Sequence, residues 1–293
     1  MVDFEVPDVD YTRYTNRQLM AIPLVVLAIA LVILSGWYVM TGSPVNQSID
    51  FTGGTELTVQ TDTPRGDLAA QFDPAPTSIQ SVTDQENRYI LTFKESGGST
   101  DLAQQAEQNL RPADGADVVL SYQQVSPGFG SSTQQTALFG LALAFVGMSI
   151  LAFVLFRTFI PSLGIVISAF SDIMVPLALM NVFGIELSLG TVAALLMLIG
   201  YSVDSDILLT NHILRRSGEF YESTYRAMRT GVTMTLTSIS AMAVMAIVAF
   251  VFRIELLASI GLVLVFGLAT DLMNTYMFNV SLLRWYKIGG VES

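Results

Sequence analysis

The chain has 293 residues, of which 52% are hydrophobic and 13% charged, and its mean hydropathy is +0.54. Soluble domains carry about a quarter charged residues, so this composition excludes a soluble globule, and it equally excludes disorder. A formal charge of -11 excludes nucleic acid as a partner. The chain has no cysteine and one histidine, so we expect no disulfide, metal centre or cofactor. The composition indicates a membrane protein.

Six apolar runs are long enough to cross a bilayer core of about 30 Å, which takes about 20 helical residues. Since lipid offers no hydrogen bonds to the backbone, each run is predicted to be a helix. The runs are Leu19–Met40, Thr136–Phe156, Phe159–Phe183, Leu187–Leu209, Gly231–Phe252 and Leu256–Leu283.

The basic residues near the short loops predict the orientation in the cytoplasmic membrane. With both termini inside, only Arg253 lies near a short outer loop, whereas nine basic residues lie on the inner side, as the positive-inside rule favours. The nine are Arg13, Arg17, Arg157, Arg215, Arg216, Arg226, Arg229, Arg284 and Lys287. The predicted divisions are a cytoplasmic tail (1–17), the first membrane helix (18–40), an extracytoplasmic domain (41–134), five membrane helices (135–285) and a cytoplasmic tail (286–293).

The segment 41–134 is predicted to be a small α+β domain. Strand-like stretches occur at Ile49–Phe51 with Glu56–Thr61, at Ser78–Thr83, at Tyr89–Phe93 and at Asp117–Gln124, and helix-like stretches occur at Asp67–Phe72 and Asp101–Leu110. The order β-α-β-β-α-β is that of a ferredoxin-like unit. Residues 126–133 are predicted to be a hinge into the second membrane helix.

The acidic residues of this segment point to a high-salt habitat. It holds 12 acidic and 4 basic residues, a net charge of -8. Molar salt shortens the Debye length to about 3 Å and screens such a surface against its own repulsion. We therefore expect a halophilic source.

Two motifs carry a family resemblance. Ile49-Asp-Phe-Thr-Gly-Gly-Thr-Glu-Leu57 follows the first helix, and Gly200-Tyr-Ser-Val-Asp-Ser-Asp-Ile-Leu-Leu209 lies in the fourth. With the one-plus-five arrangement of helices, they resemble the SecD/SecF family of protein-export membrane proteins, in particular its SecF branch and the archaeal type. That family belongs to the resistance-nodulation-division (RND) superfamily, so the resemblance implies half of an RND-type membrane unit.

The resemblance also implies a function and its partners. It implies a subunit that assists Sec-dependent protein export with the proton or another ion gradient, beside a SecD-type subunit, a SecYE-type channel, the translocating polypeptide and membrane lipid. The chain lacks a Gly-x4-Gly-Lys-Ser/Thr phosphate-binding motif, and we expect no enzymatic activity. Two alternatives remain open: a stand-alone carrier of a lipid or small solute, and a structural stabiliser of the translocation channel.

Four carboxylates within the apolar runs are candidates for ion coupling: Asp172, Asp204, Asp206 and Asp271. A charged side chain at mid-membrane costs about 2.5–3.5 kcal/mol on insertion scales, which favours a functional role, with a structural hydrogen-bonding role as the alternative. Asp204 and Asp206 lie about 200° apart around a helix and cannot share a face. We expect Asp204 to be buried beside Gly200, which would let a helix approach closely. Asp206 is expected nearer solvent. Which of the two couples to the ion stays open.

The fifth helix carries a polar stripe at helical spacing, made of Arg226, Arg229, Thr230, Thr233, Thr237 and Ser240. One interpretation is a hydrophilic path in which Arg229 pairs with an aspartate of the fourth helix. The alternative is an arginine that anchors the helix at the headgroups.

The first motif contributes Asp50, Gly53, Gly54 and Thr55. Paired glycines allow strained turns and close backbone approach, so a structural role is predicted for this motif.

Overall fold

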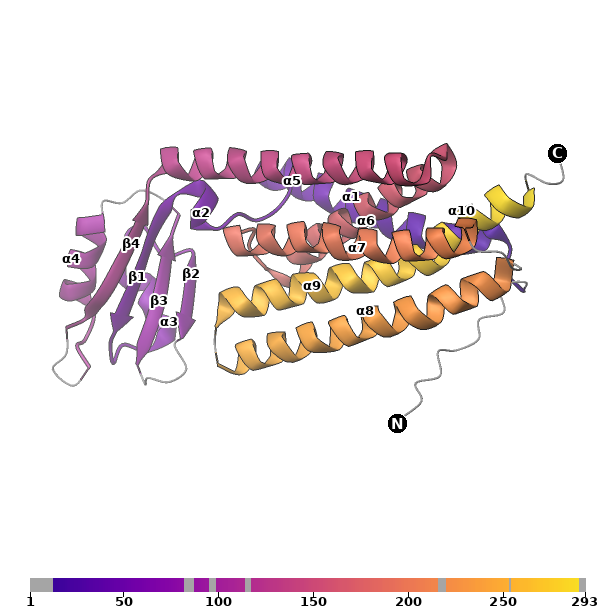
Figure 1. The fold of residues 1–293 in the computed structure, drawn as a ribbon. Helices are drawn as coiled ribbons and strands as arrows, with labels where there is room; N and C mark the ends of the chain where they lie inside the picture. Colours follow the sequence, from indigo (N-terminus) through magenta and orange to yellow (C-terminus); the bar gives the residue numbers. More distant parts are fainter. Residues whose placement is uncertain are drawn as a thin grey trace.

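The computed structural model describes residues 13–81, 87–94, 99–113, 117–215, 220–252 and 254–289. Figure 1 shows a small sheet domain at one end of a bundle of long helices. The acidic tail before residue 13, Arg216, Arg253, the end of the predicted strand at 82–83 and the last residues of the C-terminal tail lie outside the described residues.

Six helical spans within the described residues are long and apolar enough to cross a membrane, and they coincide with the six predicted runs. They are built from α1 (Asn16–Thr41), α5 (Pro127–Phe156), α6 (Phe159–Phe183), α7 (Leu189–Arg215), α8 (Phe220–Val251) and α9 (Glu255–Met273). The last span continues without a break through the π-helix η3 (Asn274–Asn279), α10 (Val280–Arg284) and the π-helix η4 (Trp285–Gly289).

The predicted hinge at 126–133 is wrong, because residues from Pro127 onward form the first turns of α5. Ser126 caps the helix by accepting a hydrogen bond from the Phe129 N–H, 3.3 Å away. Proline at the first helical position is compatible with a helix start, since no intrahelical partner exists there for its missing N–H. One continuous helix therefore connects the sheet domain to the bundle (Figure 1).

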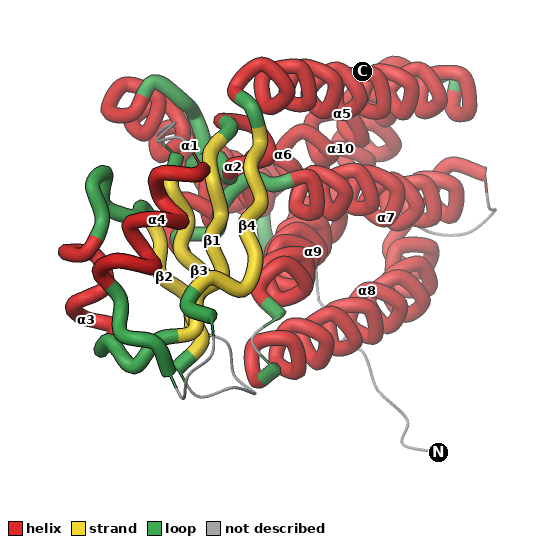
Figure 2. Tube along the Cα trace, turned by 90° about the vertical axis from the view of Figure 1, so that its left-hand side faces the viewer, coloured by secondary structure: helices red, strands yellow, loops and turns green. Residues whose placement is uncertain are grey.

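The described residues of the sheet domain form eight short elements: α2 (Ile49–Thr52), β1 (Gly54–Gln60), α3 (Arg65–Leu68), the 3-10 helix η2 (Ala69–Gln71), β2 (Ser78–Ser81), β3 (Arg88–Phe93), α4 (Ser99–Asn109) and β4 (Val119–Val125). The strands are antiparallel in the order β2-β3-β1-β4. Figure 2 shows α4 over the face turned away from the long helices. Alternate residues of β1 and β3 fill the core beneath it: Leu57, Val59, Leu91 and Phe93.

The strand predicted at Ile49–Phe51 is also wrong, because these residues form the single turn α2. Ser48 accepts a hydrogen bond from the Asp50 N–H at 3.3 Å and caps the turn. Gly53 ends it with a φ of 73°, a conformation that only glycine adopts at little cost.

Among the long helices, α6 and α7 are the most buried, and α5 and α8 are the least buried. Close contacts occur at glycines other than the predicted one: Gly267 of α9 lies against Leu198 of α7, and Gly231 of α8 lies against Tyr276. An added Cβ at Gly200 would meet nothing within 4 Å. The close approach predicted at Gly200 is therefore wrong.

Candidate functional site

Three of the four candidate carboxylates meet inside the bundle. Asp172 of α6, Asp206 of α7 and Asp271 of α9 have exposed fractions of 1%, 0% and 1%. The three carboxyl groups lie close enough together for their charges to repel when they are ionised. We call these three residues the carboxyl cluster.

Asp172 joins α6 to the two neighbouring helical segments. The Ser202 hydroxyl on α7 donates to its Oδ2, and the Asn274 amide of η3 donates to its Oδ1 at 2.7 Å. All three side chains are buried. One carboxyl group thus fixes α6 against both α7 and the end of α9.

Asp206 and Asp271 form the second part of the cluster. The Thr275 hydroxyl lies 2.9 Å from Asp206 Oδ1 and 3.2 Å from Asp271 Oδ1. The Asn279 amide also donates to Asp206 Oδ1. On the other side, the Ser205 hydroxyl of α7 donates to Asp271 at 2.8 Å. Thr275 therefore links the two carboxyl groups directly.

The π-helix η3 brings three donors to the cluster at once. Asn274 points to α6, while Thr275 and Asn279 point to α7. A wider helical turn changes the direction of successive side chains, and π-helical segments recur at functional sites. Sequence reasoning missed these donors, although polar residues at three- to four-residue spacing in an apolar span were the available signal.

The described donors to the three carboxyl groups are neutral hydroxyls and amides. Among the described residues, no donor meets hydrogen-bond geometry at Asp206 Oδ2, and the Ser168 hydroxyl of α6 lies near the Asp172 and Asp206 carboxyls. No group of three or more acidic, histidine or cysteine side chains in the described part of the chain has the geometry of a metal centre. The arrangement suits a carboxyl cluster whose charge is balanced by a proton or a monovalent cation from solution.

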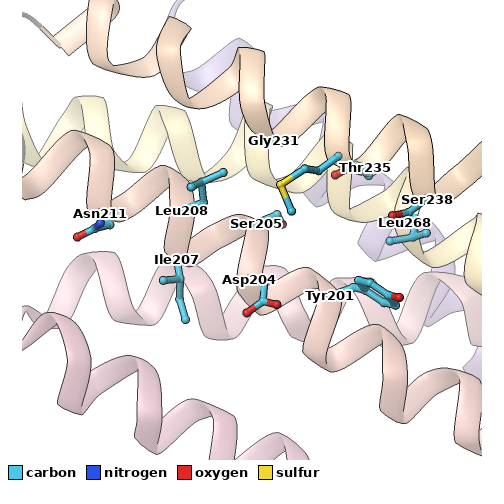
Figure 3. A pocket seen from close by; sticks show the side chains of 11 residues that line it. Tyr201, Asp204, Ser205, Ile207, Leu208, Asn211, Gly231, Thr235, Ser238 and Leu268 are labelled. Carbon is cyan, nitrogen blue, oxygen red and sulfur yellow. The ribbon is translucent and has the colours of Figure 1, made fainter.

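Asp204 lies on a different face of α7, as the 200° separation predicted, but the expected burial of the two residues is reversed. Asp206 is fully buried, so its predicted position near solvent is wrong, and Asp204 is exposed. Asp204 lines a groove of about 380 Å³ between α7, α8 and α9. Figure 3 shows the Asp204 carboxylate and the Ser205 hydroxyl leaving α7 in different directions.

The polar stripe of α8 faces outward. Thr233, Thr237 and Ser240 are exposed, and each hydroxyl donates to the carbonyl four residues earlier. Arg229 is also exposed and forms no ion pair with Asp204 within the described part of the chain. The groove beside Asp204 is lined instead by other α8 residues: Gly231, Met234, Thr235 and Ser238.

The glycines of the first motif allow close backbone contact, as predicted. An added Cβ at Gly53 would lie 2.8 Å from Pro127 Cα. Gly54 has a φ of 145°, and its added Cβ would collide with the Phe93 carbonyl oxygen. Thr55 is fully buried at the start of β1.

Asp50 reaches from α2 to the bundle, where its Oδ2 accepts a hydrogen bond from the Leu189 N–H of α7 at 3.1 Å. Nearby, burial raises the pKa of Glu56, and the Asp50 carboxylate raises it further.

Comparisons with known proteins agree with this architecture. The SecD/SecF C-terminal family of protein export membrane proteins matches residues 105–288, and the SecD/SecF GG motif matches residues 38–64. The protein-export membrane protein SecF of Haloferax volcanii is 65% identical, with 99% of each chain covered. The protein of the same name from Haloquadratum walsbyi is 62% identical, with the same coverage. These sources agree with the expected halophilic origin.

A solved structure has the same fold. The crystal structure of SecDF, a translocon-associated membrane protein from Thermus, matches with a TM-score of 0.72 at 19% identity. The match covers 96% of this chain and 39% of that one, so this chain spans well under half of the Thermus protein. The family matches and the full-length relatives give one assignment: the chain belongs to the SecD/SecF family, as a multi-pass membrane protein of the SecF type and an accessory subunit of Sec protein export.

Proposed function

We propose that this subunit uses the proton or another cation gradient to assist Sec-dependent export, through the carboxyl cluster of Asp172, Asp206 and Asp271. The single observation that carries the proposal is the burial of three interacting carboxyl groups whose described donors are all neutral. Ionisable groups inside a membrane span are candidates for ion pathways. Of the two aspartates of α7 that the sequence left open, this proposal assigns the coupling role to Asp206.

The cluster offers a way to turn cation exchange into helix movement. A proton or monovalent cation on Asp206 Oδ2 would balance charge at an oxygen for which no described residue provides a hydrogen bond. Its departure leaves adjacent carboxylates that repel each other, and α6, α7 and η3 then settle in another arrangement. One elementary charge moving across 100 mV supplies about 2.3 kcal/mol, enough to shift such an equilibrium by more than tenfold.

We further propose that a SecD-type subunit covers the α7–α8 groove. An exposed carboxylate in a membrane span needs a polar or positively charged neighbour, and the exposed Asp204 lines this groove. The Thermus protein holds a matching region within a chain much longer than this one. A SecYE-type channel, the translocating polypeptide and membrane lipid are the other partners in this proposal.

Asp206→Asn tests the coupling role. Asparagine keeps the size and one acceptor oxygen for Thr275 but cannot exchange a proton or carry a charge. We expect the variant to assemble with its SecD-type partner, while the gradient-stimulated part of export is lost. The measurement is export into membrane vesicles with and without a collapsed gradient.

Glu222→Gln is the matched control, because it neutralises an exposed carboxylate at the start of α8 that is not part of the carboxyl cluster. This control should keep full gradient stimulation. Wild-type stimulation in an assembled Asp206→Asn complex would contradict the coupling role and favour a structural stabiliser.

We also propose that the sheet domain is a ferredoxin-like extracytoplasmic domain and that both termini are cytoplasmic. The element order β-α-β-β-α-β and the antiparallel strand order β2-β3-β1-β4 support the fold assignment. The distribution of basic residues supports the orientation. The Arg284 guanidinium donates to the Tyr14 carbonyl at 3.0 Å, which agrees with the two chain ends lying on one side.

Cysteine labelling tests this orientation cleanly, since the chain has no native cysteine. On intact cells, an impermeant thiol reagent should modify Ser121→Cys on β4, which is exposed, and should leave Ser293→Cys unmodified until the membrane is opened. The reverse pattern would overturn the orientation.

A further inference from the structure

The linker between α1 and the sheet domain is attached to the loop that begins α7. The Leu187 N–H donates to the Asn46 carbonyl at 2.7 Å, and the Ser48 N–H donates to the Leu187 carbonyl at 3.0 Å. Asn181 at the end of α6 completes this attachment, because its side chain bonds Pro44 and Asn46 at 2.8 and 3.1 Å. The linker therefore follows the α6–α7 loop closely.

Side chains of the sheet domain add two further connections. Lys94, directly after β3, forms an ion pair with Glu186 of the same loop at 3.0 Å. Asp50 accepts the hydrogen bond from the Leu189 N–H, the first of α7. The first N–H groups of a helix have no partner within it, and the helix dipole favours a negative charge at this end.

The same helix carries three members of the hydrogen-bond network at the carboxyl cluster. Ser202, Ser205 and Asp206 lie within α7, 13 to 17 residues beyond Leu189. At 1.5 Å per residue, about 20–25 Å of continuous helix separates Asp50 from the cluster. A helix of this length moves as a rigid body, so a displacement of α7 at the cluster also displaces its outer end.

We propose that Asp50 is a positioning residue that connects the sheet domain to α7, so that α7 transmits movement at the carboxyl cluster to the domain. This inference rests on the proposed function, since the cation-dependent movement of α7 is its source. The glycine contacts fix the domain to α5, as Gly53 lies against Pro127. The domain is then held by two helices, and a shift of α7 relative to α5 tilts it.

The experiment measures the distance between the domain and the bundle by pulsed electron paramagnetic resonance. Spin labels are placed at Ser121→Cys on β4 and at Ile254→Cys between α8 and α9, both exposed, in the full chain with its SecD-type partner in proteoliposomes. We expect the wild type to change its distance distribution when the cation gradient is applied. Asp50→Ala should assemble normally yet lose this change, together with gradient-stimulated export.

Two further variants distinguish a positioning role of Asp50 from nonspecific destabilisation of the domain. Asp67→Ala removes an exposed carboxylate of α3 and should behave as wild type. Asp50→Asn retains an acceptor for the Leu189 N–H but loses the charge, so it should keep a reduced change. An equal change in wild type and Asp50→Ala would overturn the inference and leave the proposed function standing. If the distance distribution of the wild type does not change when the gradient is applied, both the inference and the cation-dependent movement are wrong. The export assay of Asp206→Asn, in contrast, tests the coupling role by itself.

Discussion

Gly54→Ala is expected to destabilise the protein by about 2–6 kcal/mol and to lower the yield of folded chain. The residue has a φ of 145°, which costs a non-glycine residue about 1–3 kcal/mol. The new Cβ would also collide with the Phe93 carbonyl oxygen and come within 2.9 Å of Ile49 Cγ2, and overpacking of this kind adds about 1–3 kcal/mol. Backbone atoms of β3 cannot move aside without breaking the β1–β3 pairing. The measurement is the thermal unfolding midpoint of the purified chain.

Gly66→Ala is the matched control, because its Cβ would meet nothing within 4 Å and its φ is not positive. It should unfold at or slightly above the wild-type temperature, since alanine restricts the unfolded chain more than glycine does. A Gly54→Ala protein with the wild-type midpoint would show that the turn at the start of β1 relaxes freely.

Asp172→Leu is expected to destabilise the helix bundle by about 1–4 kcal/mol and to remove gradient-stimulated export. Leucine has the same branching as aspartate but is larger and accepts no hydrogen bond, so the Ser202 hydroxyl and the Asn274 amide lose their buried partner. Each lost bond within a membrane bundle is worth about 0.5–2 kcal/mol. The free energy of unfolding is measured by steric trapping or by denaturant titration in detergent.

A double-mutant cycle checks the physical cause. Because Asn274→Leu removes one of the orphaned donors, the double variant Asp172→Leu/Asn274→Leu should cost less than the sum of the single variants. Asp172→Asn, which keeps one acceptor, should unfold near the wild-type midpoint while still failing to respond to the gradient. Additive costs in the cycle would mean that the bond between residues 172 and 274 contributes nothing to stability.

Much of the architecture follows from the sequence alone. Six spans were predictable because length and apolar composition are sufficient to identify a membrane helix, and all six are present in the structure. Most strands of the sheet domain were predictable from β-branched and aromatic runs between turn residues. The two motifs were sufficient to suggest the family that the comparisons show.

The predicted secondary structure was wrong where capping residues set the backbone conformation of a short segment. Ile49–Phe51 has the composition of a strand, yet the Ser48 cap and the left-handed Gly53 close it into a turn. Residues 126–133 are rich in glycine and serine, which is typical of a loop, yet the Ser126 cap and Pro127 start α5 there. Side-chain capping contributes about 1 kcal/mol, enough to override weak propensities over one or two turns.

The tertiary structure alone decided which carboxylates act together. The sequence by itself determined that Asp204 and Asp206 lie on different faces of one helix, because a residue turns about 100° around the axis. It could not determine which face is inward, since polar residues lie on more than one side of α7 and its rotation depends on packing against α6 and α9. That packing buries Asp206 with Asp172 and Asp271 and leaves Asp204 in the exposed groove. The π-helix η3 then supplies Asn274, Thr275 and Asn279 to the cluster, because its wider turn changes the direction in which successive side chains point.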